Sequence, residues 1–155
     1  MRTSHYLTPE RIIFFNEDIS HEEALKTLVR QLDLDDDAVS EAISHRENLG
    51  STCVNSEIAF PHAKIIGLDQ IRASLGISTN GIAAPQGGLI RLFLLFVSPM
   101  ENTNQHLRFL ASASSLLLTE NMTDLLAELK HGEAVWQKIN ELETLRYAAR
   151  KEQHA

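Results

Sequence analysis

The sequence predicts an α/β fold: a single domain in which a mixed β-sheet of about five strands is flanked by helices on both sides. Two amphipathic helical patterns precede Gly50, apolar strand-like segments fill the middle, and the last third is again helical. Helices before and after a small sheet are typical of helices packed on a mixed sheet. A chain of 155 residues suits one domain with one core, so we expect residues 1–155 to form a single domain.

The first predicted elements are a short strand and two helices. The apolar run Ile12–Phe15 predicts the strand, and Ser20 with Glu23 forms a capping box that starts a helix over residues 21–32. A second helix over residues 36–47 begins at an acidic cluster, which suits a positive helix terminus, and stops before Gly50. Apolar residues at helical spacing predict the buried faces of both helices: Ala24, Leu25, Leu28, Val29 and Leu32, then Val39, Ala42 and Ile43.

The middle of the chain is rich in strand signals. Glu57–Pro61 and the alternating segment Ile71–Ser78 predict two strands. Asn80-Gly81 is a strong turn signal, and Pro85–Gly88 predicts a second loop. The most apolar segment, Leu89–Val97, predicts a strand buried on both faces.

The last third predicts three helices. Thr103 or Asn104 is expected to cap the first, Thr123 to cap the second, and Gly132 to end the second. A long final helix is predicted over residues 133–151. The expected inner faces are Leu107, Leu110, Ala111, Ser114 and Leu117 or Leu118 in the first helix, and Val135, Trp136, Ile139, Leu142 and Leu145 in the last.

Composition excludes several classes of protein. An apolar content of 43% with 23% charged residues is ordinary for a globular protein, and the longest apolar run, Leu92–Val97, is too short to cross a bilayer. The N-terminus lacks the apolar region of a secretory signal, and the single cysteine, Cys53, cannot form an internal disulfide or a cysteine-based zinc cluster. We therefore expect a cytoplasmic protein in which Cys53 has no catalytic role.

The net charge of −7 argues against nucleic acid as a partner, because binding phosphates requires a basic face. An acidic surface is compatible with docking onto a basic protein, and it also serves solubility alone.

The segment Gly50–Lys64, with sequence GSTCVNSEIAFPHAK, carries the most distinctive polar residue of the chain, His62. Pro61 removes a backbone donor and belongs at a strand end, so His62 is expected where a buried strand leaves the sheet. A ring held there on a rigid support, with open space before it, suits a reactive imidazole. The alternative is that His62 only caps a strand.

Two further residues lie beside predicted element ends. Arg46 ends the second helix, and His106 lies in the first turn of the helix after the buried strand. An arginine fork, two imidazoles and free helix-end amides would together suit a phosphoryl group. Ser51 and Thr52, in the turn after Gly50, add hydroxyl and amide donors as phosphate-contacting candidates.

These residues resemble a known family. The segment RENLGSTCVNSEIAFPHAK is similar to the active-site region of the EIIA domains of the fructose–mannitol class, which belong to the bacterial phosphoenolpyruvate-dependent sugar phosphotransferase system and include a nitrogen-regulatory paralogue. The specific combination is the Ile58–His62 core, with Arg46 sixteen residues before His62 and His106 forty-four residues after it. The resemblance extends over nearly the whole chain, which identifies residues 1–155 as one EIIA-like phosphocarrier domain.

The resemblance implies a phosphohistidine relay that feeds sugar uptake. His62 would accept a phosphoryl group from the phosphocarrier protein HPr or a relative and pass it to an EIIB domain. His106 would hydrogen-bond the phosphoryl oxygens, and Arg46 would supply positive charge. Histidine can form a covalent phosphoryl intermediate, and holding donor and acceptor in line needs no metal or organic cofactor. Peripheral association with a membrane transporter is compatible with this role.

Two positions depart from the family pattern. Ala63 stands where family members usually have glycine, which is tolerable if φ is negative there. Asn55-Ser56-Glu57 replaces an often glycine-rich loop, where asparagine tolerates left-handed backbone. We expect Glu57 to point outward, since a carboxylate facing the site would repel an incoming phosphoryl group.

Three other functions remain open from the sequence. A regulatory EIIA paralogue, whose phosphorylation state controls binding to other proteins, would share the same chemistry. A metal-dependent hydrolase using His62 and His106 lacks a nearby third ligand. A pure interaction module would have lost phosphorylation altogether. The sugar, the acceptor protein, the imidazole nitrogen used and the oligomeric state are not predicted.

Overall fold

The computed structural model describes residues 1–154 and contains a five-stranded mixed sheet. Strands β4 (Arg72–Ala83) and β5 (Leu89–Pro99) form a central antiparallel hairpin. Strand β1 (Ile12–Phe14) runs parallel to β4, while β2 (Ile58–Ala59) and β3 (His62–Ile65) follow one another in parallel along β5. The α/β fold class predicted from the sequence is confirmed.

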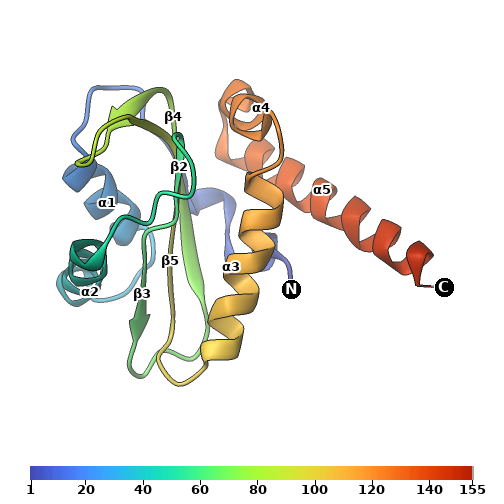
Figure 1. Cartoon of the computed structure of the whole chain (residues 1–155), viewed down its shortest axis with the longest axis horizontal. Helices are drawn as coiled ribbons and strands as arrows, with labels where there is room; N and C mark the ends of the chain where they lie inside the picture. The colour runs from blue at the N-terminus through green and yellow to red at the C-terminus, as the bar shows by residue number, and fades with distance from the viewer. Residues whose placement is uncertain (155) are drawn as a thin grey trace.

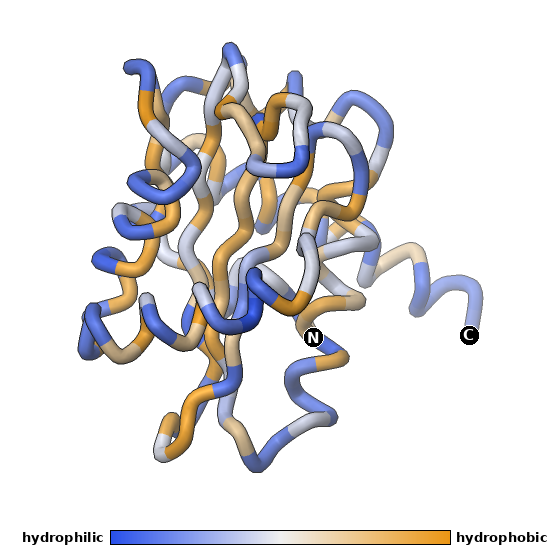
Figure 2. Tube along the Cα trace, turned by 60° about the vertical axis from the view of Figure 1, so that its left-hand side comes forward, coloured by the Kyte–Doolittle hydropathy of each residue, from blue (hydrophilic) through white to orange (hydrophobic). Residues whose placement is uncertain are grey.

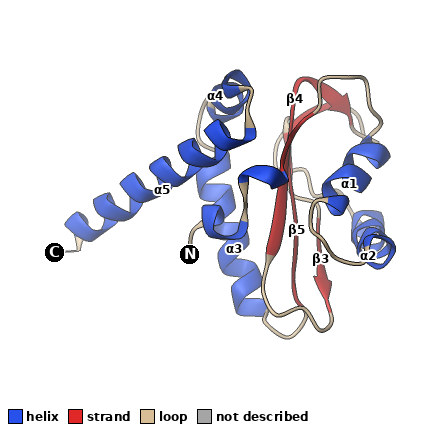
Figure 3. Cartoon of the chain, turned by 180° about the vertical axis from the view of Figure 1, so that it is seen from behind, coloured by secondary structure: helices blue, strands red, loops and turns tan. Residues whose placement is uncertain are grey.

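Helices cover both faces of the sheet (Figure 1, Figure 3). Helices α1 (His21–Arg30) and α2 (Asp36–Leu49) lie on one face. Helices α3 (Thr103–Leu117), α4 (Met122–Leu129) and α5 (Gly132–Gln153) lie on the other, where the end of α5 extends away from the body. Two short 3-10 helices, η1 (Thr3–Tyr6) and η2 (Pro9–Arg11), precede β1 and contact α5.

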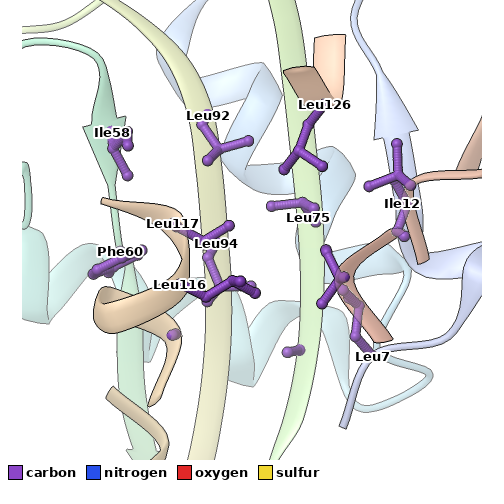
Figure 4. Close-up of a cluster of buried hydrophobic side chains, with 14 of the residues drawn as sticks. Leu7, Ile12, Ile58, Phe60, Leu75, Leu92, Leu94, Leu116, Leu117 and Leu126 are labelled. Carbon is purple, nitrogen blue, oxygen red and sulfur yellow. The ribbon is translucent and has the colours of Figure 1, made fainter. Parts of the chain in front are cut away.

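Each face of the sheet has its own hydrophobic core, because successive side chains of β5 point to opposite sides. Leu92, Leu94 and Phe96 pack under α3, α4 and α5, where Figure 4 shows Leu116, Leu117 and Leu126 directed at the strands. Phe93, Leu95 and Val97 instead pack with α1 and α2. Burying each such side chain is worth about 1.5–3 kcal/mol. Figure 2 shows apolar residues along the strands, while the helices alternate between apolar and hydrophilic residues. The strand next to His62 is therefore held firmly from both sides.

The turn predicted at Asn80-Gly81 is wrong. Strand β4 runs through both residues to Ala83, and its pairing with β5 shifts register between Ile77 and Ile82. Gly81 has φ of 87°, and a Cβ there would lie 2.6 Å from Cβ of Leu89. The glycine therefore serves a close approach inside the strand pair, while the hairpin turns at the predicted Pro85–Gly88 loop, where Gly87 donates to the carbonyl of Ala84.

Several expectations for the last third are also wrong. The side chain of Asn102, rather than Thr103 or Asn104, caps α3 by accepting from the amide of Gln105. The buried face of α3 is His106, Phe109, Ala113, Leu116 and Leu117, whereas Leu107 and Leu118 are exposed. Of the expected inner face, Leu117 is buried and Leu110 packs against the core, but the remaining positions were misassigned because apolar residues occur on both sides of the helix.

The junction between α4 and α5 differs from the expected one in a similar way. Thr123 is buried inside α4 and makes no cap, and Lys130, with φ of 63°, ends that helix. Gly132 does not end α4 but begins α5, and a side chain is excluded there because a Cβ would lie 2.6 Å from the carbonyl oxygen of Pro9. Leu145, expected to face inward, is 59% exposed.

Candidate functional site

His62 is the first residue of β3, directly opposite Phe96 of β5. The prediction that it leaves the sheet is wrong, because β3 resumes the pairing with β5 that β2 began, and the amide of Phe96 bridges the gap by donating to the carbonyl of Pro61. The imidazole stacks on the Phe96 ring, with centroids 5.2 Å apart and planes 16° apart. Its support is therefore the central strand of the sheet.

A single hydrogen bond sets the tautomer of His62. Its Nδ1 lies 2.7 Å from the carbonyl oxygen of Phe60. A carbonyl oxygen can only accept, so Nδ1 carries the proton and donates it. In the neutral ring this leaves the lone pair on Nε2, the nitrogen turned away from the main chain.

His106 meets His62 from the other end of the site. It lies in the first turn of α3, is buried, and holds its Nδ1 2.5 Å from Oγ of Ser98, a β5 residue. The two imidazoles stand edge to face with centroids 5.1 Å apart. Helix α3 and strand β3 thus bring together two histidines that are distant in the sequence.

Both histidines have lowered pKa values. Burial is the largest cause for His62; the positive charges of Arg46 and Lys64 lower its pKa further, while the hydrogen bond to Phe60 and the carboxylate of Glu47 oppose the change. Burial, followed by His62, Lys64 and Arg46, lowers the pKa of His106 to about 4. At neutral pH both rings are uncharged, so the Nε2 lone pair of His62 is free to act as a nucleophile.

Arg46 lies in the last turn of α2 and donates to the carbonyl of Gly50, so it holds the turn while its charge reaches both imidazoles. Ser51 and Thr52 are placed differently. The buried Thr52 hydroxyl donates to the carboxylate of Glu47 at 2.5 Å, and Oγ of Ser51 accepts from the amide of Cys53 and from Gln86. The Thr52 hydroxyl proton is therefore engaged by Glu47, whereas the Ser51 oxygen only accepts and keeps its own proton for donation.

Sequence reasoning missed three contributors to this site: Lys64, Glu47 and Ser98. Lys64 could have been found, because residues two apart on a strand share a face and Lys64 follows His62 by two in β3. Glu47 follows Arg46 directly but is polar surface by pattern. Nothing in the sequence indicates that Ser98 meets His106.

The two departures from the family pattern are accommodated. The carboxylate of Glu57 lies 3.5 Å from the guanidinium of Arg91, which also binds Asp124. The negative charge of Glu57 is therefore paired with a cation outside the histidine pair. Ala63 is not among the described residues with positive φ. Asn55 does not use left-handed backbone either; its side chain accepts from the amides of Glu57 and Ile58.

Comparison with known proteins places this geometry in a family. Residues 5–142 match the model of the family described as phosphoenolpyruvate-dependent sugar phosphotransferase system, EIIA 2. The chain belongs to this EIIA family. The resemblance drawn from the residues around His62 is thereby confirmed, and membership gives the chain a general role in phosphoryl transfer.

Three known proteins are similar to this chain, one in sequence and two in fold. The chain is 28% identical over 148 residues to the fructose-specific EIIABC component of Bacillus subtilis (strain 168), covering 91% of this chain but only 23% of that protein. In fold it is similar to nitrogen regulatory protein IIA-Ntr from Neisseria meningitidis, with TM-score 0.78, 21% identity, and coverage of 88% of this chain and 97% of that one. It is also similar to the Escherichia coli IIA mannitol enzyme in complex with phosphorylated IIB mannitol, with TM-score 0.66, 18% identity, and coverage of 84% and 95%.

Two structural features of this EIIA chain concern membranes and metal ions. None of the helices within residues 1–154 is both long and apolar enough to cross a membrane. Within the same residues, no three His, Cys, Asp or Glu side chains gather where they could hold a metal ion.

Proposed function

We propose that this EIIA domain is a cytoplasmic phosphohistidine relay protein that serves sugar uptake. Nε2 of His62 accepts a phosphoryl group from an HPr-like phosphocarrier and passes it to an EIIB domain. The hydrogen bond between Nδ1 of His62 and the carbonyl of Phe60 carries the proposal. It leaves Nε2 as the nitrogen with a lone pair in a ring whose lowered pKa keeps it neutral.

The transfer step conserves atoms and charge. The Nε2 lone pair attacks phosphorus, an N–P bond forms, and the bond from phosphorus to the donor atom breaks, with its electron pair leaving on the donor. Nδ1 keeps its proton, and the Phe60 carbonyl stabilises the positive charge that the ring gains. Transfer to the acceptor reverses these events, with an acceptor atom attacking phosphorus and the N–P electrons returning to Nε2.

His106 is the second active-site residue in this proposal. Its Nδ1 can accept the hydroxyl proton of Ser98, which puts the ring proton on Nε2 as a donor for a phosphoryl oxygen. Arg46 supplies positive charge to the same oxygens, and Lys64 adds to it. The Thr52 hydroxyl already donates to Glu47, so a contact of Thr52 with phosphate would come from its backbone amide, whereas Ser51 can still donate its hydroxyl proton to a phosphate oxygen.

The surroundings of the histidines favour docking of a partner protein. Exposed apolar side chains lie within, or in the loops next to, the elements that carry Arg46, His62 and His106: Leu49, Val54, Ile66, Met100 and Leu107. An apolar surface around a reactive group is typical of protein interfaces. The EIIB partner is supported by the mannitol IIA neighbour, which was solved with its phosphorylated IIB.

A regulatory paralogue is the second candidate function, favoured by the fold similarity to IIA-Ntr. In that role the phosphorylation state of His62 would control binding to a target protein. The chemistry at His62 would be the same, so only the acceptor separates the two functions.

The proposal is tested by incubating the protein with phosphoenolpyruvate, enzyme I and HPr. We expect acid-labile phosphate in the native protein and in the control His45→Ala, which alters an exposed histidine one residue before Arg46, and none in His62→Ala. Label retained by folded His62→Ala would move the acceptor elsewhere, and no label in the native protein would leave only an interaction module. Chasing the phosphoprotein against a panel of EIIB domains then separates transport from regulation.

A further inference from the structure

A surface cavity of about 670 Å³ lies between the N-terminal segment, α3 and α5. Four arginines line it: Arg2, Arg108, Arg146 and Arg150. It shares no lining residue with the histidine site, and Arg108 follows His106 by two positions, which turns it about 200° around α3. The two sites therefore use different sides of one helix.

The four arginines are not neutralised by the protein. Among residues 1–154, none of them has a carboxylate oxygen within ion-pair distance. Arg2 donates to the hydroxyl of Thr144, and Arg146 donates to the carbonyl and hydroxyl of Ser115. Four guanidinium groups around one cavity, in a chain of net charge −7, make a local site for negative charge.

The carboxylate in the cavity wall is committed elsewhere. Glu143 is buried, and its two oxygens accept the amides of Thr3 and Ser4 at 2.8 and 2.9 Å. This pair of bonds fastens the N-terminal segment to α5, which brings Arg2 to the cavity. Glu143 thus builds the site, and its oxygens are engaged by amides rather than by the arginines.

The size and apolar part of the wall define the ligand further. A volume near 670 Å³ is in the range of pockets that bind whole organic molecules, well above that of one phosphate ion. Leu116 and Tyr147 add apolar surface, and the Tyr147 ring already lies within 6 Å of two cations, Arg2 and Lys151.

We propose that this cavity binds a phosphorylated organic anion of nucleotide size, with the phosphates on the arginines and the organic part against Leu116 and Tyr147. Arginine is suited to phosphate because its planar fork donates two parallel hydrogen bonds. Half of the wall, including Arg2, Arg146 and Arg150, lies outside the family match of residues 5–142. The site is therefore distinct from the phosphoryl site and independent of the function proposed for it.

Isothermal titration of the full chain tests the proposal, with ATP in the absence of magnesium, inorganic triphosphate and adenosine as probes. We expect ATP to bind most tightly, triphosphate more weakly, and adenosine not at all. The test variant is Arg108→Gln/Arg150→Gln, because neither side chain makes a hydrogen bond with another described residue, so their loss spares the fold. It should weaken ATP binding by about tenfold or more, equivalent to about 1.4 kcal/mol.

The matched control is Arg11→Gln/Arg30→Gln, which removes the same two charges from a region outside the cavity. It should change ATP affinity by less than about twofold, and Arg46→Gln should do the same. Equal weakening in both double variants would reduce the effect to overall charge, and weakening confined to Arg46→Gln would place the anion at the histidine site; either result overturns the proposal. Equal affinity for ATP and triphosphate, or no ATP binding near 1 mM, overturns it as well.

Discussion

Helix α3 separates two polar regions of opposite electrostatic character. At its first turn, the imidazoles of His62 and His106 are uncharged, meet edge to face, and are fixed by the backbone carbonyl of Phe60 and the hydroxyl of Ser98. On its other side, the arginine cavity has permanent charges on long side chains. A group that forms a covalent bond needs a lone pair and a fixed direction, whereas reversible anion binding needs charge. On the proposed functions, positive charge alone would therefore not distinguish the phosphoryl site.

The largest expected effect comes from disabling each region in turn and measuring both activities. His62→Ala should abolish phosphoryl acceptance and leave ATP affinity within about twofold of native. Arg108→Gln/Arg150→Gln should do the reverse, because it touches neither imidazole. Phosphotransfer labelling and titration on the same preparations measure both properties. A variant that impaired both activities while folded would show that the regions work as one site.

The second expected effect concerns the division of labour within the histidine pair. His106→Ala should still accept phosphate on His62 but pass it to an EIIB domain about 100-fold more slowly, the usual cost of losing one hydrogen-bond donor to a transition state. Rapid-quench measurement of a single turnover from the phosphorylated protein gives this rate. Complete loss of labelling in a folded His106→Ala protein would mean that the roles of the two histidines are reversed.

The third expected effect follows from the low pKa of His106. The folded pKa is about 4, whereas an unfolded histidine titrates near 6.5. Between these pH values the unfolded chain binds a proton at His106 and the native protein does not. The contribution of the neutral ring to the free energy of unfolding is therefore fully present above pH 6.5 and is lost as pH falls toward 4. The difference is worth on the order of 3 kcal/mol at the acid end.

Denaturant unfolding of the native protein and His106→Gln, at several pH values from 7 to 4, measures this loss. The native free energy of unfolding should fall more steeply than that of His106→Gln, since the carboxylates common to both cancel in the comparison. Parallel pH profiles for the two proteins would show that the imidazole is not held neutral by burial.

How well the sequence predicted these regions depends on how local the signals were. The Ser20–Glu23 capping box acts within one helical turn, and α1 begins where it predicts. The convergence of His62 and His106 was expected because a motif carried both, although the strand context of His62 was not. Gly81 and Gly132 were misinterpreted because each must be glycine to leave room for an atom outside its own turn of chain. That atom belongs to the Leu89 side chain for Gly81 and is the Pro9 carbonyl oxygen for Gly132.

The arginine cavity had no signal in the sequence. Its arginines come from the N-terminal segment, α3 and α5. The amides of Thr3 and Ser4 donate to the carboxylate of Glu143, which holds the N-terminal segment against α5. Glu143 lies four residues after Ile139 on the buried face of α5, but its charge marks it as a surface residue in the sequence. Only the tertiary structure shows that these charges share one space.

The smallest expected effect tests whether the neutral pair is oriented by its hydroxyl partner. Ser98→Ala removes the group that lies 2.5 Å from Nδ1 of His106, so the ring proton is free to move to Nδ1 and leave Nε2 without a donor. Transfer to an EIIB domain should slow by about tenfold, since hydrogen-bond partners that orient a histidine commonly change activity by that much.

The control Ser98→Thr keeps the hydroxyl and should restore most of the rate if its extra methyl group packs. A loss of stability alone would lower the midpoint of unfolding without changing the rate of transfer by the folded protein. Rapid-quench rates together with unfolding curves separate these outcomes, and an unchanged rate in Ser98→Ala would mean that His106 chooses its tautomer without Ser98.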